Sequence, residues 1–202
     1  MTNKELMNKG ELYIANDQEL ISDYLKAKRL CQEYNLTKYD DFEGRYKIIK
    51  KLVGKTKNNF NIMPPLYCDY GCNIEIGENF YSNYDLIILD VNKVTFGDNV
   101  FLAPRVSIYT AGHPIDKDIR NEQLEFGKEI KIGNDVWIGG SVTILPGVTI
   151  GNNVVIGAGS VVTKDIPDNC IAVGNPCKVL RKITEEDKKY WEKEKEKYYR
   201  NI

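Results

Sequence analysis

The sequence predicts a mainly β protein, built as a solenoid of short stacked strands with helical segments at its two ends. The main observation is a period of six residues from Ile132 to Pro167. Twelve positions, the first and fifth of each six, should point inward; eleven hold Ile or Val and the twelfth is Ser160. Ile, Leu and Val make up only about a quarter of the chain, so this pattern is not chance. A period of six fits neither a helix nor a plain strand, and it is typical of solenoids.

The residues between the aliphatic positions fit the corners of such a solenoid. A corner needs residues that tolerate a positive φ, as glycine and asparagine do. The repeat offers Gly139, Gly147, Gly151, Gly157, Asn152 and Asn153. These units resemble the hexapeptide repeats of the left-handed parallel β-helix acyltransferases. The resemblance implies three units per triangular coil and a left-handed crossover, which spacing alone does not predict because parallel crossovers are nearly always right-handed.

Composition limits the function classes. The 202 residues are 42% hydrophobic and 28% charged, as in a soluble protein of one domain with a small appendage. A net charge of −1 gives no basis for attraction to nucleic acid or to a membrane. No apolar run approaches the roughly 20 residues of a membrane span, and the acidic, Asn-rich start is unlike a signal peptide. We therefore expect a cytoplasmic location.

The five cysteines, an odd number, include no Cys-x2-Cys pair. Cys68 and Cys72 could face a metal, but one pair without a nearby histidine favours buried small side chains. We expect no metal site.

The first part of the chain, residues 1–58, is expected to be a helical segment that packs on the solenoid or on a neighbouring subunit. Asp17 could cap one helix, and a second helix follows. Their expected apolar faces are Leu20, Ile21, Tyr24, Leu25, Leu30 and Cys31, and then Phe42, Tyr46, Ile49 and Val53. The segment resembles the N-terminal part of maltose and galactoside O-acetyltransferases. Asp17 therefore has two open roles, as a helix cap or, by the resemblance, as a ligand of sugar hydroxyls.

The β-helix is expected over residues 59–183, with less regular coils between residues 62 and 109. Ile88 and Phe96 are eight residues apart instead of six, so two extra residues near Asn92 and Lys93 should bulge a corner outward. The segments Pro64–Gly71 and Asn79–Val91 are similar to the maltose acetyltransferase group. They place the resemblance closest to the maltose branch.

The repeat is interrupted at about residues 110–129, where we expect an extruded loop. An interruption in a solenoid usually forms a loop on one face, and functional residues often lie there. The loop carries the only histidine, His113, between Gly112 and Pro114. A lone histidine in a loop is usually an ordinary surface residue. The family that this chain resembles, however, has its catalytic histidine at the corresponding position.

The chemistry that the resemblance implies is acetyl transfer from acetyl-CoA to a hydroxyl of a sugar. The hydroxyl needs a base, and a neutral imidazole with an ordinary pKa of about 6.5 is suited to that task. His113 is thus the expected general base, which passes the proton to the departing thiol without a covalent enzyme intermediate. By the resemblance, Asn83 and the backbone N–H groups near Gly140 and Ser141 would stabilise the tetrahedral oxygen.

The remaining site residues are carried over from the family. Carboxylates and amides that would bind the acceptor are Asp17, Asp69, Asn83, Asp90 and, more weakly, Glu125. Asp69 and Asp90 could instead simply form turns. Val91 stands where galactoside acetyltransferases tend to have a second carboxylate, which favours maltose or glucose as the acceptor.

The coenzyme should lie along the later coils. Trp137, expected at a coil corner, would lie near the pantetheine arm, and Gly140 and Ala158 would allow its close approach. The phosphates of the coenzyme would contact Thr163, Lys164, Lys178 and Arg181. These four residues could instead be ordinary solvated surface residues.

The chain should end in a helix over residues 184–202, where Thr184 and Asp187 form a capping box. The resemblance further implies a homotrimer with active sites between subunits.

Three alternative functions are weighed against sugar acetylation. A metal-dependent lyase resembling the γ-type carbonic anhydrases needs three histidines, and the chain has one. A non-catalytic assembly module would leave His113, Trp137 and the basic residues without a function. An acetyltransferase for an antibiotic or for serine stays open.

Overall fold

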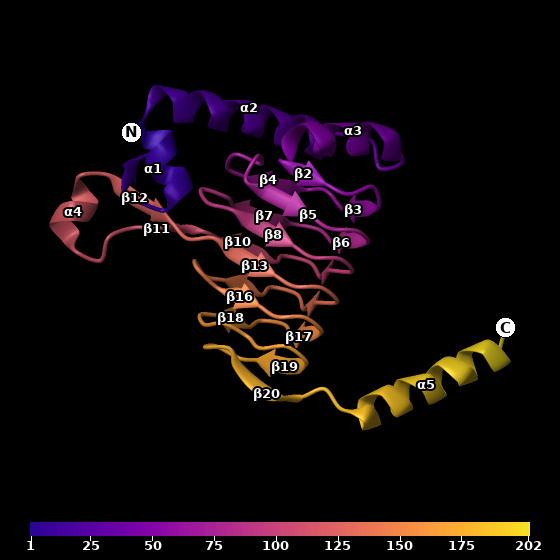
Figure 1. Ribbon diagram of the computed structural model, residues 1–202. Helices are drawn as coiled ribbons and strands as arrows, with labels where there is room; N and C mark the ends of the chain where they lie inside the picture. The colour runs from indigo at the N-terminus through magenta and orange to yellow at the C-terminus, as the bar shows by residue number, and fades with distance from the viewer.

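The computed structural model describes residues 1–202, in which parallel strands stack into a solenoid with helices at both ends (Figure 1). The predicted parallel β-helix is confirmed, with its N-terminal helices, extruded loop and C-terminal helix. Three sheets form its faces. We name them the charged face (β2-β5-β8-β13-β16), the mixed face (β4-β7-β10-β15-β18) and the aromatic face (β3-β6-β9-β14-β17-β19-β20).

The strands of the faces are two to five residues long. The charged face contains Lys55–Thr56 (β2), Ile74–Ile76 (β5), Val94–Phe96 (β8), Ile130–Ile132 (β13) and Thr149–Ile150 (β16). The mixed face contains Leu66–Cys68 (β4), Leu86–Leu89 (β7), Ser107–Tyr109 (β10), Thr143–Ile144 (β15) and Val161–Val162 (β18). The aromatic face contains Phe60–Ile62 (β3), Phe80–Ser82 (β6), Phe101–Leu102 (β9), Trp137–Ile138 (β14), Val154–Ile156 (β17), Cys170–Val173 (β19) and Lys178–Lys182 (β20).

All twelve inward positions of the six-residue repeat are buried. The one polar member, Ser160, donates to the carbonyl of Gly157 at 2.6 Å and accepts from the N–H of Gly174 at 3.0 Å. A buried hydroxyl with both partners costs little. Ser160 therefore closes the corner of its coil without interrupting the aliphatic core.

The corners use asparagine and glycine in two different ways. Asn153 and Gly147 have positive φ, as expected. Asn152 does not, and neither do three of the glycines, Gly139, Gly151 and Gly157, which corrects the expectation for all four. A Cβ at any of these three glycines would lie within 3 Å of the next coil, so they are required for close stacking of coils.

The sequence suggested that the N-terminal segment is helical throughout, but the structure shows a strand within it. Asn3–Lys9 (α1) ends at Gly10, whose φ is 77°, and Tyr13–Ile14 (β1) then forms a strand. The helices Gln18–Asn35 (α2) and Phe42–Leu52 (α3) follow, and both lie across the first coil (Figure 1).

Asp17 caps α2, because its side chain accepts from the N–H of Glu19 at 3.0 Å. The apolar faces differ in part from the prediction. Ile21, Tyr24 and Leu25 are 39–45% exposed, while Ala27 and Tyr34 are buried in their stead. Phe42 is 64% exposed because it precedes the turn of α3 that packs on the core.

The extruded loop carries Ala111–Gly112 (β11), Lys117–Asn121 (α4) and Leu124–Gly127 (β12). Together with β1, these two strands form a three-stranded antiparallel sheet in the order β1-β12-β11. The corner of the solenoid at Asn92 contacts both α1 and this sheet, because the Asn92 amide donates to the carbonyls of Met7 and Gly127 at 3.3 Å each.

The C-terminal helix, Glu185–Arg200 (α5), begins with the predicted capping box of Thr184 and Asp187. It buries no residue and extends away from the solenoid (Figure 1). The antiparallel strand β20 that precedes it was not expected from the sequence. None of the helices combines the length and apolar character of a membrane span.

Candidate active site

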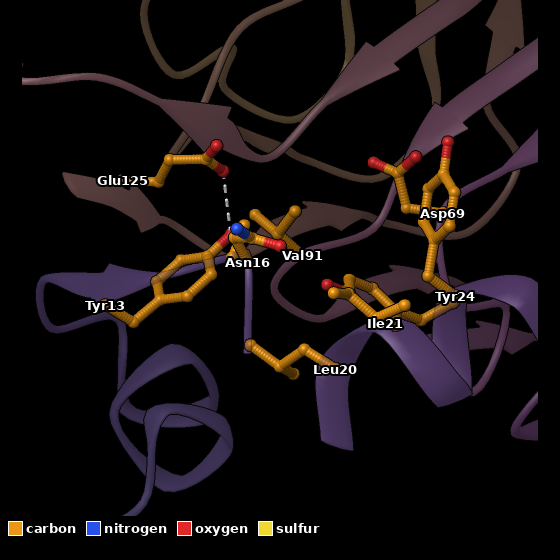
Figure 2. A pocket seen from close by; sticks show the side chains of 10 residues that line it. Tyr13, Asn16, Leu20, Ile21, Tyr24, Asp69, Val91 and Glu125 are labelled. Atoms are coloured by element: carbon orange, nitrogen blue, oxygen red, sulfur yellow. Dashed lines mark hydrogen bonds between the residues drawn. The ribbon is translucent and has the colours of Figure 1, made fainter. Parts of the chain in front are cut away.

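A pocket of about 370 Å³ lies between α2, β1 and the corner that follows β4. Its polar side chains are Asn16, Asp69 and Glu125, and the rest of its lining is mainly aromatic or aliphatic. Figure 2 shows Asp69 and Glu125 on opposite sides, with Val91, Ile21 and Leu20 between them. The pocket therefore offers an apolar floor with hydrogen-bond acceptors at both ends.

Both carboxylates have partners within the chain. Lys28 Nζ lies 3.2 Å from Asp69, and the Tyr13 hydroxyl donates to Glu125 at 3.0 Å (Figure 2). Burial raises the pKa of Tyr13, so its hydroxyl keeps its proton at neutral pH. The carboxylates of Asp69 and Glu125 are thus held in place, and each still has lone pairs that can accept a hydrogen bond from a molecule in the pocket.

Asp90 lies behind the pocket wall and has no exposed surface. One carboxylate oxygen accepts from the N–H groups of Asp69 and Tyr70 at 2.9 Å each, and the other has no partner. Burial raises the pKa of this carboxyl to about 7. Within one chain Asp90 thus holds the backbone that carries Asp69 and does not line the pocket.

Asp17 does not line the pocket either. It is occupied as the cap of α2, and it also accepts from the Asn3 amide at 3.2 Å. Its neighbour Asn16 lies on the pocket wall instead.

His113 follows β11 directly and its side chain is exposed. In the ladder between β11 and β12, Ala111 is opposite Gly127 and Gly112 is opposite Phe126. Continuing this register by one residue places His113 opposite Glu125, which is itself paired with Tyr13 on β1. Opposite residues of an antiparallel ladder share a face, so this register would carry the histidine on the same side of the sheet as Glu125, although the ladder itself ends at Gly112 and His113 does not line the pocket.

The predicted residues fall on two different edges of the solenoid. The loop edge, between the mixed and charged faces, carries Asp69, Asp90, the extruded loop, Thr163 and Lys164. The donor edge, between the aromatic and mixed faces, carries Asn83, Gly140, Ala158 and the turn before Lys178. Asn83 and Asp90 lie beyond opposite ends of β7, whose four residues span roughly 13 Å. One chain therefore keeps Asn83 apart from the pocket.

The residues expected to bind the coenzyme are mostly free at the surface. Trp137 is 56% exposed, but it lies in β14 on the aromatic face opposite Phe101, not at a corner as expected. Thr163, Lys164 and Lys178 are exposed. Arg181 differs, because its guanidinium binds both carboxylate oxygens of Asp187, at 2.6 and 2.8 Å.

Several pocket residues were not predicted from the sequence. Tyr13, Tyr24, Lys28 and Tyr70 all contribute to the pocket or to its carboxylates. The only sequence signal for Tyr13 is Gly10, which ends α1 and allows a strand to follow.

No three His, Cys, Asp or Glu side chains are grouped closely enough to hold a metal ion. Cys68 is buried against Cys31. Cys72 is exposed, so the expectation that both Cys68 and Cys72 are buried was wrong for Cys72, which follows the turn at Gly71.

Comparisons with known proteins agree with this architecture. Residues 6–57 match the maltose acetyltransferase hexapeptide capping motif, and residues 129–164 match the bacterial transferase hexapeptide with its six repeats. The galactoside O-acetyltransferase of Escherichia coli is 44% identical over 94% of this chain and 94% of its own.

Two solved structures are similar over nearly their whole length. A maltose O-acetyltransferase from Clostridium difficile 630 has a TM-score of 0.90 and 55% identity, covering 91% of this chain and 98% of its own. A galactoside acetyltransferase in complex with coenzyme A has a TM-score of 0.88 and 44% identity, covering 93% and 94%. The extent and identity of these matches show that this chain belongs to the maltose and galactoside O-acetyltransferases, a family of hexapeptide-repeat acyltransferases.

Proposed function

We propose that the protein transfers the acetyl group of acetyl-CoA to a hydroxyl of a sugar, with His113 as the general base. The observation that carries the proposal is the order of the three-stranded sheet: Tyr13 on β1 pairs with Glu125 on β12, which lines the pocket, and His113 directly follows β11 on the other side of β12. The names of the relatives support the reaction class, since they include galactoside and maltose O-acetyltransferases.

The transfer is a direct attack. An acceptor hydroxyl gives its proton to the imidazole of His113 as its oxygen bonds to the acetyl carbon. The tetrahedral intermediate then expels the coenzyme thiolate, and the imidazolium returns the proton to the sulfur. The amide of Asn83 and the backbone N–H groups at Gly140 and Ser141 stabilise the negative oxygen.

The acceptor binds in the pocket beside α2. Asp69 and Glu125 accept hydrogen bonds from hydroxyls at the two ends, and the apolar floor contacts the C–H face of a sugar ring. Val91 puts an aliphatic group in this floor. Maltose or glucose is the favoured acceptor, and a galactoside is the next.

A second copy of the chain completes the site. On the aromatic face, the outward side chains form an apolar row that nothing covers in a single chain. The row consists of Tyr81, Phe101, Trp137, Val155 and Ile171. The charged face presents Lys55, Glu75 and Lys131 instead. Apolar rows favour association, so a homotrimer would bury the aromatic or the mixed face and leave the charged face in water.

In such a trimer the loop edge of one subunit meets the donor edge of the next. His113 and the pocket of one copy then face Asn83, Gly140 and Ala158 of its neighbour. The coenzyme lies between the two, with its phosphates near Thr163 and Lys164 of one copy and Lys178 and Arg181 of the other. The extended pantetheine arm passes Trp137.

The test is thiol release from acetyl-CoA with maltose, glucose, a galactoside, serine and a chloramphenicol-type alcohol. We expect a sugar-dependent rate that His113→Ala lowers by about two to four orders of magnitude, while the loop variant Lys117→Ala keeps it. Turnover only with serine or the antibiotic would refute the sugar acceptor. Failure of all acceptors together with failure to bind coenzyme would favour the assembly module.

A further inference from the structure

The helix α2 and the end of β4 contact each other through three pairs of side chains in reverse order. Tyr24 packs edge to face on Tyr70 with ring centroids 6.3 Å apart. Lys28 lies 3.2 Å from Asp69, and Cys31 Sγ lies 3.5 Å from Cys68 Sγ. Tyr24, Tyr70 and Asp69 from the first two pairs line the acceptor pocket, and Lys28 holds Asp69 from outside it. The third continues the same seam into the core.

The two thiols contact each other within the core. Cys31 is 4% exposed and Cys68 is not exposed at all, and one thiol donates a hydrogen bond to the other. The hydrogen bond from Cys68 lowers the pKa of Cys31, while the same bond and burial raise the pKa of Cys68. We assign Cys31, on the surface helix α2, as the attacking thiol and Cys68, in β4, as the thiol that resolves it.

We propose that Cys31 and Cys68 are a redox-sensitive pair that closes to an intramolecular disulfide in the presence of peroxide and fastens α2 to β4 beside the acceptor pocket. The Cys31 thiolate attacks hydrogen peroxide, the O–O bond breaks, and protonation of the released hydroxide gives one water and the Cys31 sulfenic acid. The Cys68 thiol then attacks that sulfur, the S–O bond breaks, and the oxygen leaves as a second water. Two thiols lose two electrons in total, and the peroxide gains them.

The bond would move the pocket wall. A disulfide needs an S–S distance of about 2.05 Å, so the 3.5 Å separation must close by about 1.5 Å. Lys28 lies about one helical turn before Cys31 and donates to both the carbonyl of Cys68 and the carboxylate of Asp69. A shift of α2 against β4 therefore changes the position of Asp69, which faces the acceptor.

Hollows on both sides of α2 provide the space for the helix to open. The acceptor pocket lies on one side, and a cavity of about 200 Å³ lined by Ala27 and Leu30 lies on the other. Proteins open locally below the free energy of global unfolding, and such an opening of α2 would let a molecule as small as peroxide reach Cys31.

The experiment uses the full chain with Cys72→Ser, which removes the exposed thiol. After peroxide treatment we expect an intact mass lower by two hydrogens and a peptide that joins Cys31 to Cys68. We also expect a midpoint of thermal unfolding raised by about 5 °C or more. Dithiothreitol should reverse all three. The added change Cys31→Ser should abolish them, whereas the matched change Cys170→Ser should not.

The effect on activity rests on the proposed function and is measured separately. Oxidation should change the acceptor KM at least about threefold, while the acetyl-CoA KM stays within about twofold. An oxidised mass that gains oxygen atoms, or no reaction at Cys31 under peroxide that oxidises Cys72 in the unmodified chain, would overturn the pair. A disulfide with an unchanged acceptor KM would overturn its coupling to the pocket. An inactive protein would refute the proposed function, but the mass and the unfolding midpoint would still report the disulfide.

Discussion

The buried carboxylate of Asp90 accepts a hydrogen bond of 2.9 Å from the backbone N–H of Asp69, the residue that presents its own carboxylate to the pocket. Asp90 thus supports the pocket from behind. Its second oxygen has no partner, so ionisation of the group is costly in the folded protein.

This cost predicts a pH dependence of stability. The pKa of Asp90 is about 7 in the folded protein against 3.8 for the ordinary group. Between these values the folded state keeps a proton that the unfolded state has lost. Stability should therefore fall as the pH rises from about 4 to about 7 and level off above, by on the order of 4 kcal/mol at most from this group.

Chemical denaturation of Asp90→Asn at pH 5 and pH 8 measures the effect. The difference in unfolding free energy between these pH values should be smaller than in the unmodified protein. Asp118→Asn, at an exposed carboxyl in the loop, should show the same difference between the two pH values as the unmodified protein. An equal pH slope in all three proteins would contradict the raised pKa of Asp90.

His113→Ala should separate activity from stability. The side chain is exposed, so the unfolding free energy should change by less than about 0.5 kcal/mol. Loss of the base should nevertheless lower kcat by about two to four orders of magnitude, without a comparable rise in the KM of either substrate. A large loss of stability would indicate a structural role for the ring.

Complementation tests whether the site lies between subunits. His113→Ala and Asn83→Ala should each be weakly active alone. In the proposed homotrimer, random mixing of equal amounts puts both variants in three quarters of the trimers, and each of these has one intact site of three, so about a quarter of the full rate should return. No recovery after mixing would place both residues in the same chain's site.

Ser160→Val tests the polar position in the core. Valine fits the repeat, but it leaves the N–H of Gly174 without its acceptor and the carbonyl of Gly157 without its donor. We expect a loss of about 1–3 kcal/mol in the free energy of unfolding. Thr163→Val, at an exposed position of the same coil, should change it by less than about 0.5 kcal/mol. A stabilised Ser160→Val protein would show that packing outweighs these hydrogen bonds.

Lys178 and Arg181 should differ in their contribution to coenzyme binding. Lys178→Ala should raise the KM of acetyl-CoA about tenfold with little change in kcat, because a phosphate contact is made equally in the ground and transition states. Arg181→Ala should have a smaller effect, since Asp187 already holds the guanidinium. Equal effects would mean that the coenzyme displaces Asp187 from Arg181.

Much of the architecture follows from local patterns. A six-residue period can be satisfied only by stacked short strands, and the Thr184 and Asp187 capping box begins α5 through contacts three residues apart. The interruption of the repeat predicted the loop that carries His113. The expectation for Asp17 as a cap also depended on neighbouring residues, and it is confirmed. The outward bulge near Asn92 stays a prediction.

The sequence by itself therefore determined the solenoid, its ends and the loop with the only histidine, because each depends on spacing along the chain. The tertiary structure alone decided which residues share the pocket. Tyr13 meets Glu125 across 112 residues, Cys31 meets Cys68 across 37, and Asp90 is buried where a surface ligand was expected. Such contacts depend on how helices and loop pack on the coils, a long-range arrangement that no local period encodes.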